Sequence, residues 1–401
     1  MSPTAARQAN EAMVDRLIGL GALWSPPLIA AFRETPRHLF LHRVYQYQRR
    51  AGRWREVPGR DPGPDVLRLL YADRALITRL SPGSRTEGPV PISSSSQPSL
   101  MAQMLEDLKP GPGQRVLEVG AGTGYNAALL AHAAGPGQVW SIDVDRQVLS
   151  EAWDHLHSFA GRRVELRHAD GRCGYAEAAP FDRVMVTAAT PDLEPAWLEQ
   201  LAPGGLLLAP LALAPGLAFV VCGGVADGIF EGRLTRAAFF MPLRSEGETG
   251  GAGAEAPRPG PFTTLPAPWA DWFDRKRSRP GWLGFIQALA FYALLRGLRL
   301  SYQALADGEA TFGVADPDER TWCWLGEEAW HVTGEAGREL GVRLWRAFLD
   351  AGGPWPTEFR LRASPCGELA VGEGREVYER QGPRCRQVWE LVEPRERPAW
   401  L

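Results

Sequence analysis

The segment Val116–Asn126 constrains the fold of this 401-residue chain more than any other. Its sequence is Val-Leu-Glu-Val-Gly-Ala-Gly-Thr-Gly-Tyr-Asn, so an apolar strand ends at Val119 and three alternate glycines follow it. Glycine allows a backbone to turn sharply and to approach a ligand closely. A strand, a glycine turn and a helix in this order are typical of nucleotide-binding α/β units.

The residues after this turn continue to alternate between strands and helices. We predict helices at residues 125–134 and 146–160, and strands at 115–119, 138–143, 164–168, 182–187 and 205–211. Strands that are separated by helices need crossover connections and form a parallel sheet. We therefore predict a Rossmann-like, doubly wound α/β fold for this part of the chain.

The composition and the pattern change after residue 245. Residues 246–261 are rich in Gly, Pro and Ala, which predicts a linker. Beyond it we expect helices at 269–277, 282–298 and 335–350 and short strands at 311–315, 321–325 and 358–362. The sequence therefore predicts a catalytic-type domain at 1–245, a linker at 246–261 and a smaller α+β domain at 262–401. Residues 49–64, which are rich in Gly, Pro and Arg, are expected to form an inserted surface loop.

Charge and composition exclude several classes of partner. The net charge of −3 provides no overall basic field for nucleic acid. The N-terminus lacks the apolar core of a signal peptide, and the apolar runs at 206–221 and 282–295 contain prolines or are too short to cross a bilayer. Five scattered cysteines without a Cys-x-x-Cys pair fit reduced thiols. We expect a cytoplasmic protein with no membrane or nucleic-acid partner; the oligomeric state stays open, and a monomer is compatible.

Three acidic residues mark the ends of consecutive predicted strands. Asp143 ends the second strand, where a carboxylate can accept both ribose hydroxyl groups, and Asp170 ends the third, where it could meet an adenine amino group. Glu118 precedes the glycines and suits a cationic amino-acid ligand better than a phosphate. A dinucleotide site would have a third glycine where Asn126 stands. Together these residues predict a pocket for S-adenosylmethionine.

Short runs outside the glycine turn support a more specific assignment. They are Met13–Leu17, Pro36–Phe40, Tyr71–Arg74, Asp170–Gly171, Pro180–Asp182, Val186–Ala189, Leu201–Gly205 and Met241–Leu243. With these runs, residues 11–244 resemble the protein-L-isoaspartate O-methyltransferases. The resemblance implies S-adenosylmethionine as cofactor, S-adenosylhomocysteine as its product, and a peptide substrate. We predict a cofactor pocket lined by Gln97, Glu118, Val119, Gly120, Ala121, Gly122, Thr123, Gly124, Asn126, Asp143, Val144, Asp170, Gly171 and Thr187.

The substrate loop of the family begins Ile-Ser, which matches Ile92-Ser93. The resemblance makes Ser93 the residue that positions the substrate carboxylate, and we add Ser94 and Ser95 as further candidates. Family members usually continue Ala-Pro-His-Met, whereas this chain continues Ser-Ser-Ser-Gln-Pro to Pro98. This run, together with a C-terminal extension, resembles the branch that methylates an ordinary aspartate in ribosomally made lanthipeptides and graspetides. A flexible loop is the alternative interpretation of the serines.

These features lead to one main hypothesis and two rivals. The main hypothesis is methylation of an aspartate carboxylate in a modified, macrocyclic ribosomal peptide, whose ester then cyclises to aspartimide or isoaspartate. Residues 262–401 would recognise that peptide, and the basic cluster at 275–279 could receive acidic groups. The rivals are general isoaspartyl repair and a non-catalytic cofactor-binding module. We expect no metal, because His155 and His157 are two positions apart on a helix and point in different directions.

Overall fold

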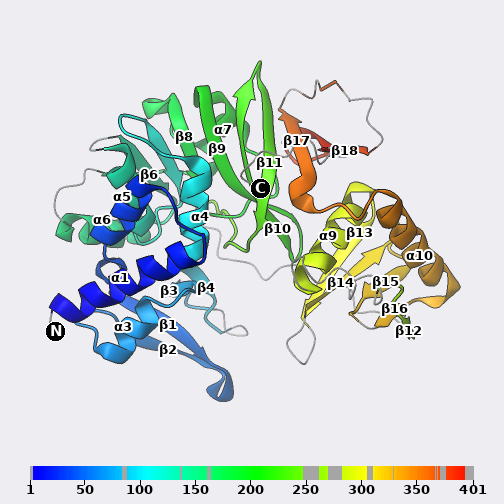
Figure 1. Ribbon diagram of the computed structural model, residues 1–401, viewed down its shortest axis with the longest axis horizontal. Coiled ribbons are helices and arrows are strands. Elements are labelled where there is room, and N and C mark those ends of the chain that lie inside the picture. The colour runs from blue at the N-terminus through cyan, green and yellow to red at the C-terminus, as the bar shows by residue number, and fades with distance from the viewer. Residues whose placement is uncertain are drawn as a thin grey trace. The chain divides into compact units, whose positions relative to one another are not determined.

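The structure is a computed structural model, shown in Figure 1. It describes residues 3–83, 88–135, 138–159, 164–246, 262–269, 282–304, 310–327, 329–365, 367, 369–370 and 376–392. The chain forms two compact units that are interleaved in sequence. The first contains Met1–Ala189, Ala196–Ala209 and Phe240–Gly251, and the second contains Thr190–Pro195, Pro210–Phe239 and Ala252–Leu401. The predicted linker and the predicted domain boundary stay predictions, because residues 247–261 lie outside the described residues.

A parallel sheet forms the centre of the first unit. Its strands are β5 (Val116–Val119), β6 (Val139–Asp143), β7 (Val164–His168), β8 (Phe181–Val186) and the first part of β9 (Leu201–Ala214), in the order β9-β8-β5-β6-β7. The helices between them are α5 (Tyr125–Ala134), α6 (Arg146–Ser158) and α7 (Pro195–Glu199). The predicted Rossmann-like, doubly wound fold is therefore confirmed. All four residues of β5 are buried, so the strand that leads into the glycine turn is held on both faces.

A second, four-stranded sheet belongs to the same unit. Its strands are β1 (Arg43–Gln48), β2 (Arg53–Pro58), β3 (Leu76–Leu80) and β4 (Pro91–Ser95), in the order β2-β1-β3-β4. The helices of this region are α1 (Pro3–Gly19), α2 (Pro26–Glu34), α3 (Pro64–Leu70) and α4 (Pro98–Leu108), with a 3₁₀ turn at Arg37–Phe40.

The prediction of a surface loop at residues 49–64 is wrong for residues 53–58, which form strand β2. A 3₁₀ turn at Arg49–Ala51 and Gly52, whose φ is 60°, reverse the chain between β1 and β2. Val57 then packs in a buried cluster with Leu41, Val44, Leu70 and Leu76. The many arginines and glycines conceal this strand in the sequence, because only one of its side chains enters the core.

The second unit contains two antiparallel sheets. One has the last part of β9, followed by β10 (Leu217–Ala226), β11 (Ile229–Ala237), β17 (Phe359–Ser364), β19 (Arg386–Leu391) and β18 (Val377–Gln381), in that order. The other has β12 (Thr263–Pro266), β16 (Ala329–Val332), β15 (Trp322–Leu325), β14 (Ala310–Ala315) and β13 (Arg299–Ala304), in that order. Its helices include α9 (Trp282–Leu295) and α10 (Gly334–Asp350). The predicted α+β character of this region is confirmed, whereas the helix predicted at 269–277 lies almost entirely outside the described residues.

Helix α9 supplies much of the core of the second unit. Phe291 is fully buried and contacts the rings of Phe219, Phe359 and Trp389 edge-on, with centroid separations of 5.3–5.6 Å. The long apolar run of this helix is therefore explained by burial in a protein core. Among the described helices, none is both long and apolar enough to cross a membrane.

A buried carboxylate holds the segment 190–195 in the second unit. Asp192 has no exposed surface, and it accepts hydrogen bonds from the backbone nitrogens of Leu193, Arg384 and Cys385 and from Gln387 Nε2, at 2.7–2.9 Å. Four donors satisfy both carboxylate oxygens, so burial of this charge is compensated. Asp192 thereby joins the loop to the start of β19.

Candidate active site

The glycine turn lies at the carboxyl end of β5, in the middle of the parallel sheet. Gly120, Gly122 and Gly124 have φ values of 99°, 52° and 79°, which side chains rarely adopt. A Cβ atom at Gly120 would clash with the hydroxyl group of Thr187. At Gly122 the only neighbour of such an atom would be the carbonyl oxygen of Ser94, at 3.7 Å. The space above Gly122 is therefore available to a ligand, bounded on one side by the serine strand β4.

Thr187, a predicted pocket residue, supports the turn directly. Its hydroxyl group lies 2.8 Å from the carbonyl oxygen of Gly120 and 3.0 Å from that of Val119, and its backbone nitrogen donates to Val119 as well. The backbone nitrogen of Ala121 donates to the carbonyl oxygen of Ile142 on the neighbouring strand. These bonds fix the turn between β8 and β6 before any ligand binds.

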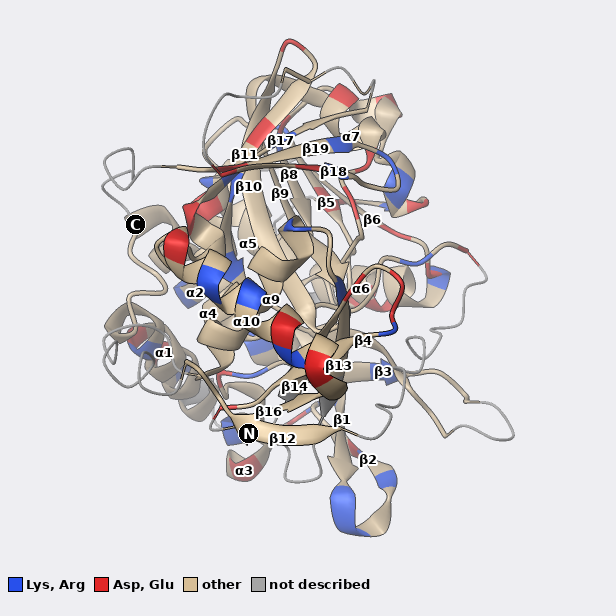
Figure 2. Ribbon diagram, turned by 90° about the vertical axis from the view of Figure 1, so that its right-hand side faces the viewer, with Lys and Arg blue, Asp and Glu red and all other residues tan. Residues whose placement is uncertain are grey.

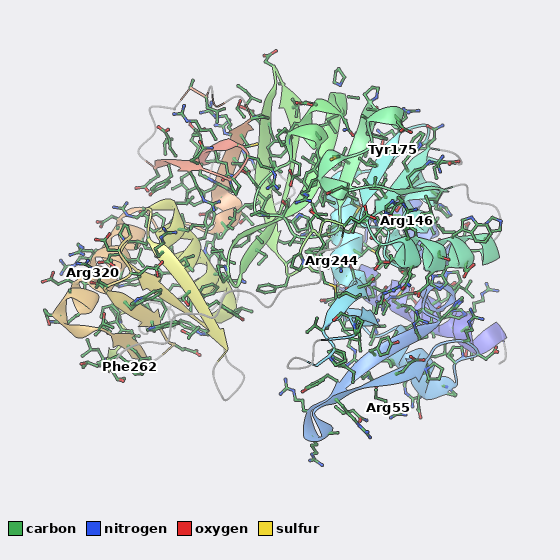
Figure 3. All side chains as sticks on the ribbon, turned by 180° about the vertical axis from the view of Figure 1, so that it is seen from behind. Arg55, Arg146, Tyr175, Arg244, Phe262 and Arg320 are labelled. Atoms are coloured by element: carbon green, nitrogen blue, oxygen red, sulfur yellow. The ribbon has the colours of Figure 1, made fainter. Side chains whose placement is uncertain are left out.

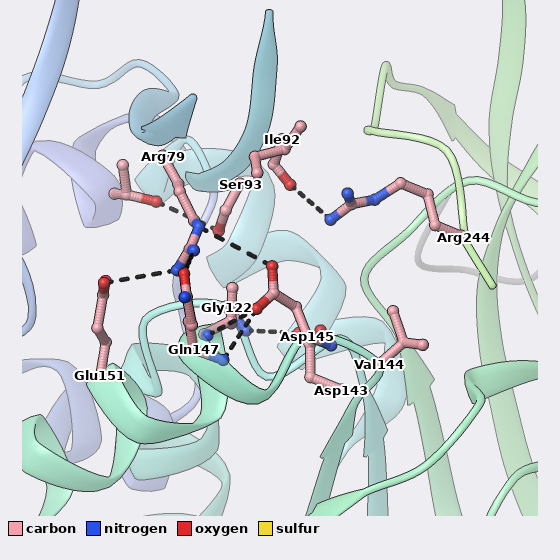
Figure 4. A network of polar contacts seen from close by, with 12 residues as sticks. Arg79, Ile92, Ser93, Gly122, Asp143, Val144, Asp145, Gln147, Glu151 and Arg244 are labelled. Atoms are coloured by element: carbon pink, nitrogen blue, oxygen red, sulfur yellow. Dashed lines mark hydrogen bonds and ion pairs between the residues drawn. The ribbon is translucent and has the colours of Figure 1, made fainter. Parts of the chain in front are cut away.

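Asp143 faces the turn from the end of β6. Its carboxylate accepts a hydrogen bond from the backbone nitrogen of Asp145 at 3.0 Å and a longer one from Gly122 at 3.4 Å. Burial raises the pKa of the Asp143 carboxyl, and the Arg244 guanidinium acts in the opposite direction. Arg244 also donates to the carbonyl oxygen of Ile92 at 3.0 Å, as Figure 4 shows. Arg244 thus contacts β4, which carries the predicted substrate serines, and acts electrostatically on Asp143, the carboxylate predicted to bind ribose.

Glu118 lies beneath the turn and has no exposed surface. Its carboxylate accepts hydrogen bonds from Asn126 Nδ2 at 2.7 Å and from Ser141 Oγ at 2.5 Å. Burial nevertheless raises the pKa of Glu118 to about 7, because the two hydrogen bonds compensate only part of the lost hydration. The Oδ1 atom of Asn126 is buried without a hydrogen-bond partner. A cation at this position would stabilise the ionised form of Glu118.

Asp170 follows β7, at the third strand end. Arg172 holds its carboxylate with two charged contacts, Nε to Oδ1 at 3.1 Å and Nη2 to Oδ2 at 2.8 Å. The adjacent Gly171 packs so closely on Val119 that a side chain there would overlap it, and its carbonyl oxygen accepts from Trp197 Nε1 at 2.7 Å. The structure therefore places all three predicted acids at the ends of adjacent strands β5, β6 and β7.

Two histidines hold backbone atoms of the predicted pocket. The Nδ1 atom of His155 lies 2.9 Å from the carbonyl oxygen of Thr123, and the Nε2 atom of His168 lies 3.0 Å from that of Val144. Each contact requires a protonated ring nitrogen as donor. Across the described ranges no group of three His, Cys, Asp or Glu side chains could hold a metal ion.

The predicted substrate serines lie on the edge strand β4. Ser93 pairs with Arg79 and Ser94 pairs with Ile77 in the register of β4 and β3, and Ser93 Oγ lies 3.3 Å from Thr78 Oγ1. Ser95 is buried, and its hydroxyl oxygen accepts from the guanidinium of Arg37 at 3.4 Å. The three serines therefore have different surroundings, and their role toward a substrate carboxylate stays a prediction.

Arg37, which belongs to the run Pro36–Phe40, is a residue whose role the sequence did not reveal. It is completely buried, and its guanidinium donates to the carbonyl oxygen of Leu70 at 2.7 Å and to that of Ser96 at 2.9 Å. Longer contacts reach the carbonyl oxygens of Ala72 and Arg74. One side chain therefore ties the segment 70–74 to the serine strand.

Asp73 accepts the hydrogen bonds that hold the N-terminus of α4. This carboxylate accepts from the backbone nitrogen of Ser99 at 2.8 Å and from Gln97 Nε2 at 3.2 Å. Gln97, a predicted pocket residue, is the N-cap position of α4 and also contacts Ser99 Oγ. A carboxylate at a helix N-terminus compensates the unpaired N–H groups there.

Arg79 connects β3 to the start of α6. Its guanidinium lies 3.9 Å from Asp145 Oδ2 and 3.6 Å from Glu151 Oε1, and it also donates to Gln147 Oε1 (Figure 4). Asp145 itself caps α6 through the backbone nitrogens of Gln147 and Val148. The four-stranded sheet is thus anchored beside the predicted ribose carboxylate.

The donor set fits S-adenosylmethionine. The open glycine turn can receive the amino-acid portion, Asp143 can accept ribose hydroxyl groups, and a cation near Glu118 would offset the burial of its charge. The fold and this site define an S-adenosylmethionine-dependent methyltransferase.

Comparisons with known proteins identify the family. Residues 74–248 match the profile of "Protein-L-isoaspartate(D-aspartate) O-methyltransferase (PCMT)". A protein-L-isoaspartate O-methyltransferase of Anaeromyxobacter dehalogenans (strain 2CP-1 / ATCC BAA-258) is 40% identical over 185 residues, which cover 45% of this chain and 87% of that protein. One from Methanopyrus kandleri is 32% identical over 245 residues, which cover 60% of this chain and 93% of that protein. The chain belongs to the protein-L-isoaspartate O-methyltransferase family, whose members are S-adenosylmethionine-dependent carboxyl O-methyltransferases.

A solved structure resembles this chain in fold over most of its length. It is titled "protein-L-isoaspartate O-methyltransferase", and it superimposes with a TM-score of 0.51 and 22% sequence identity over 88% of this chain and 96% of its own. The superposition is longer than the profile match, so it reaches into the residues that follow 262. Membership of the peptide-tailoring branch stays a prediction.

Proposed function

We propose that this enzyme transfers a methyl group from S-adenosylmethionine to the carboxylate of an isoaspartyl residue in a peptide or protein. The observation that carries this proposal is the match to relatives of that name over 87% and 93% of their own lengths. General isoaspartyl repair, which the sequence offered as the rival hypothesis, is thus better supported than the tailoring of ribosomal peptides.

The reaction needs little catalytic machinery from the protein. A carboxylate with an ordinary pKa of about 4 is already ionised at neutral pH, so no general base is required. When bound, the cofactor supplies a methyl group that is already activated for transfer. The protein must exclude water and hold the carboxylate oxygen in line with this methyl group. In this proposal the hydroxyl groups of Ser93 and Ser94 donate to the carboxylate, beside the glycine turn that Ser94 approaches.

A second candidate is methylation of an ordinary aspartate in a ribosomally made, modified peptide. The specific observation that favours it is the serine-rich strand, which departs from the usual Ala-Pro-His-Met at the place where β4 meets the glycine turn. After esterification, the next backbone nitrogen would attack the ester carbonyl carbon, losing its proton as methanol leaves, and the product would be a five-membered imide. Residues 262–401 would contribute to recognition of such a substrate.

A pair of peptides separates the two candidates. The peptides have the same sequence and differ only in an isoaspartyl or an aspartyl linkage, and the full-length enzyme is assayed for S-adenosylhomocysteine formation on each. We expect turnover of the isoaspartyl peptide and none of its partner. Turnover restricted to aspartate, in this peptide or in a cyclic peptide encoded beside the gene, would establish the second candidate. S-adenosylhomocysteine formation with neither kind of substrate would support a non-catalytic binding module.

The role of the serines is tested in the same assay. Ser94→Ala should raise KM for the peptide or lower kcat while S-adenosylmethionine affinity stays unchanged, because the contact of Ser94 with the glycine turn is made by its backbone. Ser96→Ala is the matched control from the same run, because the bond of this residue to Arg37 also uses its backbone carbonyl. Equal losses in both variants would show that the serine hydroxyl groups act only through local structure.

A further inference from the structure

The β1–β2 hairpin carries an unusual concentration of positive charge. Arg49, Arg50, Arg53 and Arg55 lie within seven residues that contain no acidic side chain, although the whole chain has a net charge of −3. All four side chains are exposed, and Figure 2 shows basic residues gathered at the tip of this hairpin. Within the part of the chain that the structure describes, none of the four forms a salt bridge. Figure 3 shows Arg55 on the same projecting hairpin.

One face of this hairpin is aromatic. Tyr47 pairs with Trp54 across the two strands, their ring centroids are 5.2 Å apart, and Tyr47 is 52% exposed. Tyr45, two residues before Tyr47, points to the same face because side chains alternate along a strand. The opposite face buries Val44 and Val57 in the core. Arg53 and Arg55 alternate with Trp54 along β2 and therefore lie on that opposite face, whereas Glu56 lies on the aromatic face and accepts a hydrogen bond from Tyr45.

The aromatic face continues to the serine strand. Tyr45 is opposite Ile77 in the pairing of β1 with β3, and Ile77 is opposite Ser94 in the pairing of β3 with β4. Residues that are directly opposite in antiparallel strands present their side chains on the same face. Tyr45, Ile77 and Ser94 therefore form a row across the sheet that leads to the glycine turn.

We infer that the aromatic face of β1–β4 is a docking surface for the peptide substrate, and that Arg49 and Arg50 in the turn of the hairpin select peptides with acidic residues on one side of the modified position. This inference rests on the proposed function and adds a substrate preference to it. The aromatic rings offer apolar contact to the peptide, and the exposed guanidinium groups of Arg49 and Arg50 offer bidentate contacts to carboxylates. The charges also attract an acidic peptide from a distance, which raises its association rate.

The geometry gives the spacing of the acidic residues. Two strand intervals separate Ser94 from Tyr45, which is about 10 Å, and four residues along β1 separate Tyr45 from Arg49, which is about 13 Å. The direct distance is then about 16 Å, which an extended peptide spans in about five residues. Carboxylates about four to six residues from the modified position should therefore reach the arginines.

The test uses pairs of isoaspartyl peptides, with one pair for each side of the isoaspartyl unit. The two peptides of a pair differ only at the three positions that lie four to six residues from this unit. One peptide carries three glutamates at these positions and the other carries three glutamines. The hairpin variant replaces Arg49 and Arg50 by Gln in the full chain. A matched control removes the same number of exposed charges from the second unit, in a variant with Arg320 and Arg346 changed to Gln.

We expect the wild-type enzyme and the control to prefer the glutamate peptide by at least about tenfold in KM with similar kcat, a preference that weakens with added salt. The hairpin variant should treat both peptides alike and keep its turnover of the glutamine peptide. Equal KM values for the two peptides with wild-type enzyme would overturn the inference, although turnover itself would still support the proposed function.

A binding measurement keeps the inference testable if neither peptide is methylated. Fluorescence anisotropy of the labelled glutamate peptide should show at least about tenfold weaker binding to the hairpin variant than to the control. Equal binding to both variants would refute the inference. Tight binding of a short single-stranded RNA, with no discrimination between the peptides, would also refute it and would assign the arginines to nucleic acid.

Discussion

Replacement of Glu118 by Gln gives the sharpest test of how the pocket works. Burial raises the pKa of this carboxyl from 4.5 to about 7, so its ionised form is less stable in the folded chain than in the unfolded chain. A shift of this size corresponds to about 3 kcal/mol. Because the folded-state pKa is the higher one, stabilisation by Glu118 is complete below pH 4.5 and is lost as the pH rises to about 7. Gln does not titrate, so the difference between the two proteins isolates this group.

The assay is urea unfolding of wild type and E118Q at several pH values. The free energy of unfolding of wild type relative to E118Q should fall by about 3 kcal/mol between pH 4 and pH 8 and stay constant above it. Saturating S-adenosylmethionine should reduce this fall, because a cation near Glu118 favours the carboxylate. A difference that does not depend on pH would refute the reasoning about burial. If the cofactor leaves the pH-dependent fall in the free energy of unfolding unchanged, the placement of its cationic portion near Glu118 is refuted.

Three further predictions concern the glycine turn and two buried charged residues. Gly122→Ala should weaken S-adenosylmethionine binding at least about tenfold in calorimetry. The control Gly113→Ala is also at positive φ and has no neighbour within 4 Å, so it should add only a similar backbone strain of about 1 kcal/mol and leave the affinity for the cofactor unchanged. Equal affinities of the two variants would contradict the close approach of the ligand to Gly122. Arg37→Met should lower the free energy of unfolding by about 3–5 kcal/mol, since buried carbonyl groups lose a charged donor, and an unchanged melting temperature would contradict this. Asp192→Ala should lower it by about 2–4 kcal/mol by leaving four donors unpaired, and a loss below about 1 kcal/mol would contradict this.

The parallel sheet and the three acids could be predicted from the sequence for one physical reason. Strands that alternate with helices must run parallel, and the carboxyl ends of parallel strands meet at one edge of a sheet. Glu118 lies near the end of β5, Asp143 ends β6 and Asp170 follows β7, so their proximity in space follows from their positions in the chain. A parallel sheet with this strand order therefore brings the three acidic side chains to the same edge of the sheet.

The residues that the sequence did not reveal act through long-range contacts. Arg37 reaches the serine strand from 58 residues away, and Arg244 reaches Ile92 from 152 residues away. Neither arginine differs in local pattern from the many others in the chain. Ser95 resembles its neighbours in sequence, yet it is buried and its hydroxyl group accepts a hydrogen bond from Arg37. Strand β2 lacks the alternating apolar pattern of a half-buried strand, because only Val57 of its six residues is buried.

The central claim is that this pocket methylates an isoaspartyl carboxylate. The most direct measurement is tandem mass spectrometry of the peptide pair after reaction with the full-length enzyme and S-adenosylmethionine, which locates the methyl ester on the chain. The account predicts a base-labile ester on the isoaspartyl residue, with an equal amount of S-adenosylhomocysteine formed. An ester found only on ordinary aspartate, or bound cofactor without any ester, would contradict it.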